Sequence, residues 1–169
     1  DWAVCIEEVK NVISERDLHA RTRNIPPIIP LTYGRLVEEK IAIIGAGPAG
    51  LSCAFYLAEK GYHPVVFEKN QKPGGMLRYG IPSFKLEKDV IDAEIDVMRQ
   101  MGVEIRCGVE VGKDVTFEEL RKEGYQAFYI AVGCQGGRLP GVPGEDAEGT
   151  MTAVELLHKV SEDESYPVS

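Results

Sequence analysis

The sequence predicts an α/β fold in three layers around a parallel sheet, and three observations support this. Apolar residues 41–44 form a strand that runs directly into the glycine-rich segment 45–50. An amphipathic helix follows and ends near Gly61, and residues 64–67 predict a second buried strand. A strand, a helix and a second strand in this order form a crossover unit whose two strands are parallel.

The glycine segment has the G-x-G-x-x-G spacing of a nucleotide phosphate site. It consists of Gly45-Ala46-Gly47-Pro48-Ala49-Gly50. Gly45 allows a tight turn, Gly47 lets a pyrophosphate approach the backbone, and Gly50 lets the helix pack closely on the strand. The amides and the positive dipole of the helix N-terminus then face the anion. We therefore expect a Rossmann-like FAD/NAD(P)-binding domain.

Glu68 stands at the end of the second strand, where a carboxylate accepts hydrogen bonds from ribose hydroxyls. A carboxylate binds a 2′,3′-diol but repels a 2′-phosphate, so FAD and NAD are favoured over NADP at this position. The alternative is an ordinary β-α-β turn with a glutamate on the surface. The coincidence of strand, glycines, helix and terminal acid favours the nucleotide site.

A second loop contains Gly74 and Gly75 and is followed by Arg78. Paired glycines beside an arginine predict backbone close to an anion, with Arg78 as its partner. The alternative, a plain turn with a surface charge, stays open. Farther along, residues 125–132 form an apolar run that predicts a buried strand. Since the carboxyl ends of parallel strands border the ligand crevice, Ala131-Val132-Gly133 are expected to meet the cofactor.

The remaining elements follow from hydrophobic periodicity and capping signals. Residues 86–101 predict a helix, and 103–107 predict a strand that 109–111 could extend. Residues 116–119 and 152–155 each have the pattern of a capping box and are expected to begin short helices.

The N-terminal part is expected to be separate from this domain. Residues 1–20 predict an amphipathic docking helix, and the proline-rich residues 21–38 predict an extended linker. Residues 39–169 form the nucleotide-binding domain. Because the chain begins at Asp1 and not at methionine, we expect it to be part of a longer protein.

Composition limits the partners and the chemistry. The net charge of −8 and the absence of a basic tract argue against nucleic acid, and no apolar run is long enough to cross a membrane. The four cysteines are widely spaced, which favours a reducing cytoplasm and gives no metal site. No catalytic group is expected, since a bound cofactor would carry any redox chemistry.

From residue 40 to about 157 the chain resembles the FAD-binding half of the glutamate synthase small-subunit family, which consists of NADPH-linked flavoproteins. The flavin part of dihydropyrimidine dehydrogenase is similar. The resemblance rests on the 45–51 glycine segment, on Phe67-Glu68-Lys69, on the run 74–86 and on 129–133. The most family-specific part is Gly74-Gly75-Met76-Leu77-Arg78-Tyr79-Gly80-Ile81-Pro82.

The resemblance implies an FAD site. The pyrophosphate would lie on 45–50, and Glu68, followed by Lys69, would hold the adenosine ribose. Val111 would offer its backbone to the adenine. The flavin side would be lined by Gly75, Met76, Leu77 and Arg78, and residues 131–133 would close over the cofactor. Lys85 stands where members often have arginine, and a lysine cannot make a bidentate phosphate contact.

The resemblance also implies partners outside this chain. In the longer protein of which this chain would be a part (the parent), hydride would pass from NADPH to FAD, and electrons would then pass to 4Fe-4S clusters. The NADPH-binding domain and the iron–sulfur domain or subunit of the parent are therefore the expected partners, and 1–20 would be a remnant of the iron–sulfur helical region. The competing hypothesis is a non-catalytic NAD(H)-binding or sensing module that uses the same glycine turn and Glu68.

Overall fold

The computed structural model describes residues 12–13, 15–16, 37–163 and 165–167. The chain divides into two compact units, Asp1–Thr32 and Tyr33–Ser169, and the second contains the sheet. In the first unit the four described residues are helical and exposed. Most of the predicted docking helix and linker lies outside the described residues.

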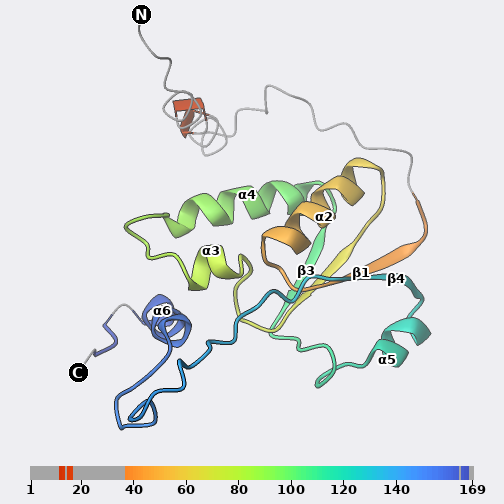
Figure 1. Cartoon of the computed structure of the whole chain (residues 1–169). Coiled ribbons are helices and arrows are strands. Elements are labelled where there is room, and N and C mark those ends of the chain that lie inside the picture. Colours follow the sequence, from red (N-terminus) through yellow and green to blue (C-terminus); the bar gives the residue numbers. More distant parts are fainter. Residues whose placement is uncertain (1–11, 14, 17–36, 164, 168–169) are drawn as a thin grey trace, which may run out of the picture. The chain divides into compact units, whose positions relative to one another are not determined.

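Four parallel strands form the central sheet in the order β3-β2-β1-β4 (Figure 1). The strands are β1 (Lys40–Ile44), β2 (Val65–Glu68), β3 (Glu104–Cys107) and β4 (Tyr125–Ile130). Five helices connect or follow them: α2 (Pro48–Glu59), α3 (Met76–Tyr79), α4 (Lys88–Gln100), α5 (Phe117–Lys122) and α6 (Ala153–Glu162). The predicted α/β class and parallel sheet are confirmed.

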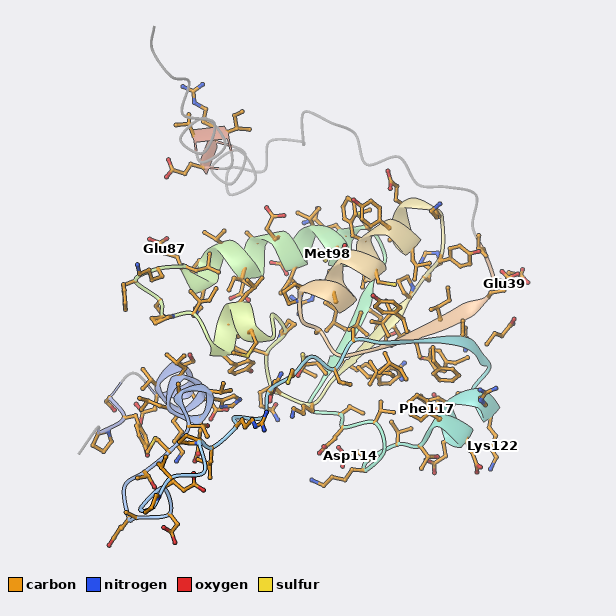
Figure 2. All side chains as sticks on the ribbon, viewed as in Figure 1. Glu39, Glu87, Met98, Asp114, Phe117 and Lys122 are labelled. Carbon is orange, nitrogen blue, oxygen red and sulfur yellow. The ribbon has the colours of Figure 1, made fainter. Side chains whose placement is uncertain are left out.

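Side chains on the two faces of β1 enter different cores, which accounts for the three layers. Ile43 is fully buried on the face next to α2, where its Cγ2 atom would lie 3.2 Å from a Cβ at Gly50. Helices α2 and α4 lie on the same side of the sheet (Figure 1). Ala42 and Ile44 point to the opposite face, where they pack with Phe67, Leu120 and other apolar residues. Figure 2 shows Phe117 of α5 on this second face, where its ring meets the ring of Phe128 edge to face at 5.3 Å.

Two strand predictions were wrong. The run 125–132 was expected to be buried, but β4 ends at Ile130 and is largely exposed, with Tyr129 43% and Ile130 64% exposed. The reason is that β4 lies at the edge of the described sheet, so one flank has no neighbouring strand there. Residues 109–111 do not extend β3, because Gly108 takes a φ of 72° and turns the chain; Val111 instead bridges to Val115.

The two predicted capping boxes have different outcomes. At α5 the box is complete: Thr116 Oγ accepts from the Glu119 amide, and the Glu119 carboxylate accepts from the Thr116 amide at 2.8 Å. At α6 only the first half forms, because the Glu155 carboxylate pairs with Lys159 one turn farther along, at 3.0 Å. The short helix α3 was not predicted at all.

We expect Thr116→Ala to lower the free energy of unfolding by about 1 kcal/mol, because an orphan amide loses its acceptor. Thr152→Ala, at the half-formed box, should lower the free energy of unfolding by less.

The capping box at α5 also depends on pH. Hydrogen bonds from Thr116 lower the pKa of Glu119. The stabilisation by this carboxylate is therefore present above the ordinary glutamate pKa and is lost as the pH falls through the lowered pKa. Urea unfolding of both variants at neutral and acidic pH measures these changes in the free energy of unfolding. Equal losses for Thr116→Ala and Thr152→Ala would contradict the assignment of a complete capping box at α5 and a half-formed one at α6.

Candidate functional site: a nucleotide cavity at the β1–α2 turn

The glycine turn after β1 is closely packed on its inner side. Gly45 has a φ of 104°, and a Cβ there would lie 2.4 Å from the Ala131 carbonyl oxygen. A Cβ at Gly50 would lie 1.9 Å from the Gly45 carbonyl oxygen. No side chain fits at either position, so the predicted tight turn and close helix packing are confirmed.

Gly47 differs from these two glycines because a Cβ there would make only an ordinary contact and would clash with no atom. The nearest atom to a Cβ built there is the Gly75 Cα, at an ordinary 3.8 Å. Gly47 is the N-cap of α2, and the first turn of α2 contains no acidic residue. A carboxylate in that turn would repel an anion at the helix N-terminus, and its absence leaves the position suitable for a phosphate.

The second glycine loop docks onto the first. The Gly74 amide donates to the Ala46 carbonyl at 2.8 Å, and Gly75 takes a φ of 53°. A Cβ at Gly75 would lie only 2.7 Å from the Gly47 Cα. Gly75 therefore needs to be glycine for close contact with the first loop, and both loops line the same opening.

Glu68 is buried, with 3% of its surface exposed, and its carboxylate points at the glycine turn. One oxygen accepts from the Ala46 amide at 2.8 Å and the other accepts from the Asn70 amide at 2.9 Å. These two bonds offset part of the cost of burying the charge and fix its orientation. Each oxygen keeps acceptor capacity for a further donor such as a ribose hydroxyl.

A cavity of about 300 Å³ opens over this turn. Twelve of the predicted site residues line it: Gly45, Gly47, Pro48, Ala49, Glu68, Lys69, Gly75, Met76, Val111, Ala131, Val132 and Gly133. Five others also line it and were missed from the sequence: Ile44, Phe67, Val109, Glu110 and Gln135. Three of these five, Ile44, Phe67 and Glu110, directly adjoin predicted residues, so their position in the chain was the available signal.

The other four predicted residues lie outside this lining. Gly50 is buried beneath the turn, and Leu77 is half-buried on α3. Arg78 is 4% exposed; its Nε donates to the Pro73 carbonyl at 2.6 Å, and its guanidinium pairs with Asp92 of α4. Lys85 is exposed in the loop before α4. Direct contact of Arg78 or Lys85 with a phosphate stays a prediction.

The environment of Cys107, near the cavity, does not activate its thiol. Burial raises the pKa of the Cys107 thiol at the end of β3, and the nearby Glu68 carboxylate raises it further. A thiol with a raised pKa is protonated at neutral pH and is a weak nucleophile. Within the described part of the chain, no cluster of His, Cys, Asp and Glu could hold a metal ion, and no helix is long and apolar enough to cross a bilayer.

Comparison with known families agrees with this geometry. Residues 43–98 match the family described as NAD(P)-binding Rossmann-like domain. This range contains the glycine turn, Glu68, the second glycine loop and most of α4. The fold therefore matches a nucleotide-binding family over the segment that builds most of the cavity.

Sequence relatives extend the match over most of the chain. The chain is 48% identical over 155 residues to the glutamate synthase [NADPH] small chain of Halomonas elongata, covering 92% of this chain and 32% of the relative. It is 42% identical over 119 residues to the corresponding small chain of Escherichia coli, covering 70% and 25%. The chain thus spans a third or less of the length of these curated relatives.

A solved structure shares the fold. FprA from Mycobacterium tuberculosis, in complex with NADPH, superposes with a TM-score of 0.63 at 26% identity, covering 73% of this chain and 28% of that one. The sequence relatives and the structural neighbour agree with the resemblance carried by the glycine loops. The chain therefore belongs to the glutamate synthase small-chain family.

Proposed function

We propose that this chain is the FAD-binding portion of an NAD(P)H-dependent oxidoreductase of the glutamate synthase small-subunit type. The observation that carries the proposal is the pairing of Gly47, which lines the cavity, with a buried Glu68 carboxylate that accepts a hydrogen bond from the amide of Ala46, the residue just before Gly47. This arrangement offers a phosphate site and a diol acceptor at the mouth of one cavity. Relatives named as glutamate synthase small chains support the redox class.

The residues of this chain fit the cofactor. The N-terminus of α2 faces the cavity with its dipole and free amides, and Gly47 leaves space for a pyrophosphate. Glu68 accepts from the ribose hydroxyls, and residues 131–133 lie along the cavity wall. When bound, FAD supplies hydride acceptance and onward electron transfer. The role of the protein is to hold and orient it.

The parts of this proposal outside the chain follow from the family. The parent would take hydride from NADPH in a second nucleotide-binding domain and pass electrons to 4Fe-4S clusters in an iron–sulfur domain or subunit. Residues 1–20 would belong to the helical part of that iron–sulfur region, joined by the linker 21–38. We propose a cytoplasmic location, as the cysteine pattern favours.

A direct titration tests the FAD assignment. We expect the purified protein to bind FAD and ADP, and to bind 2′-phospho-ADP at least tenfold more weakly, because the Glu68 carboxylate repels a 2′-phosphate. Isothermal titration calorimetry with each ligand measures this, and riboflavin, which lacks the adenine half, is the control. Binding of NADH without any binding of FAD would favour the NAD(H) module instead.

A further inference from the structure

Tyr79 joins two parts of the domain that are far apart in the chain. It is the last residue of α3, and only 6% of its surface is exposed. Its hydroxyl contacts the second glycine loop, which consists of residues 69–75, and its ring and carbonyl contact α6. Tyr79 does not line the nucleotide cavity, so its effect on a nucleotide there has to pass through the residues that it holds.

The Tyr79 hydroxyl holds the middle of the second glycine loop through two hydrogen bonds. It accepts from the Lys72 amide at 3.2 Å and donates to the Lys72 carbonyl at 3.1 Å. Burial raises the pKa of the Tyr79 hydroxyl, so the hydroxyl stays protonated at neutral pH and can donate to the carbonyl. Because a phenol is both a donor and an acceptor, one side chain fixes both backbone groups of Lys72.

Both ends of this loop meet the nucleotide cavity. Lys69 lines the cavity at one end of the loop, and Gly75 lines it at the other. Beside Gly75, the Gly74 amide donates to the Ala46 carbonyl of the first glycine turn at 2.8 Å. Lys72 lies between the two ends, so a side chain that holds Lys72 restricts the movement of both.

Helix α6 holds Tyr79 in its turn. The rings of Tyr79 and His158 stack at 4.6 Å with an angle of 10° between their planes. Ser161 Oγ donates to the Tyr79 carbonyl at 3.3 Å. The ring and the backbone of Tyr79 are therefore both fixed, which gives its hydroxyl a defined position from which to hold the loop.

We propose that Tyr79 is a positioning residue for the cofactor, because its hydroxyl holds the second glycine loop in the shape that forms one wall of the nucleotide cavity. The inference rests on the proposed FAD function and adds to it a residue that acts through the loop. Without the hydroxyl, the two backbone groups of Lys72 bond to water, and the loop opens more often. Binding of FAD then has to order the loop, which lowers the affinity.

The substitution Tyr79→Phe tests the inference because it removes the hydroxyl and keeps the ring that stacks on His158. We expect it to lower the affinity for FAD about fivefold, measured by calorimetry. Tyr56→Phe is the matched control, because it removes a tyrosine hydroxyl from α2 at a residue that is 58% exposed, and it should leave the affinity within twofold. Unchanged FAD affinity in Tyr79→Phe would overturn the inference.

Hydrogen exchange of the protein without ligand shows whether the effect is local. In Tyr79→Phe we expect the Gly74 amide to exchange about tenfold faster, because opening of the loop breaks its bond to Ala46. The Ala131 amide, which bonds to the Ile44 carbonyl, and the amides of α6 should exchange within twofold of their original rates. An equal rise at Ala131 would indicate only a general loss of stability, and an unchanged rate at Gly74 would show that the hydroxyl does not hold the loop. Either result would overturn the inference.

The proposed function and this inference fail in different ways. Failure of the unsubstituted protein to bind FAD would overturn the proposed function, and this inference with it. Binding of FAD by the unsubstituted protein, with equally tight binding by Tyr79→Phe, would overturn this inference alone.

Discussion

Replacing Gly47 with alanine is expected to leave the domain folded while lowering its affinity for FAD at least tenfold. A Cβ at this position meets no atom closer than the Gly75 Cα at 3.8 Å, and the φ of −80° is ordinary for alanine. The added methyl group would project into the space that a pyrophosphate needs. Calorimetry gives the affinity, and thermal unfolding shows that the fold is retained.

Gly50→Ala provides the contrast within the same turn. Its Cβ would lie 1.9 Å from the Gly45 carbonyl oxygen, so the helix and the turn must separate. We expect it to lower the free energy of unfolding by about 3 kcal/mol or more. Gly136→Ala is the control for both, because a Cβ there meets nothing within 4 Å. If Gly47→Ala destabilises as much as Gly50→Ala, the space at Gly47 is not a binding feature.

Replacing Arg78 with alanine is expected to lower the free energy of unfolding by about 3 kcal/mol. The guanidinium is buried, donates to the Pro73 carbonyl and pairs with Asp92, so it ties the second glycine loop to α4. Loss of the guanidinium would leave the buried Pro73 carbonyl without a hydrogen-bond donor. Urea unfolding measures the change.

Arg99→Ala is the matched control on α4. Arg99 also pairs with an aspartate, Asp96 at 2.8 Å, but is 48% exposed. An exposed pair contributes little, so this variant should lose about 0.5 kcal/mol or less. A loss for Arg78→Ala no larger than this, together with weaker FAD binding, would show instead that Arg78 meets the cofactor directly.

Features with a strong local pattern could be predicted from the sequence. The apolar strand before Gly45, the amphipathic helix α4 and the Thr116 capping box each depend on residues within a few positions of one another. The position of Glu68 beside the glycine turn also followed, because the crossover unit brings the ends of β1 and β2 together. Twelve of the residues predicted for the site line one cavity in the structure.

Features that depend on distant neighbours could not be predicted in the same way. The apolar run that became β4 gave no indication that it lies at the edge of the described sheet, and burial depends on which strands flank it. The carboxylate of Glu155 could pair either with the Thr152 amide at the start of α6 or with Lys159, and in the structure it pairs with Lys159. The sequence likewise did not reveal that Arg78 forms an ion pair with Asp92, fourteen residues farther along the chain.

The central claim is that the amides after β1 hold the diphosphate of FAD while Glu68 holds the adenosine ribose. Nuclear magnetic resonance of the isotope-labelled protein during an FAD titration tests it most directly. We predict that the largest amide shifts fall on Ala46, Gly47 and Ala49 and on residues 131–133, and that the shifts saturate with one FAD. Shifts confined to other surfaces, with the amides of the glycine turn unmoved at saturating FAD, would contradict the claim.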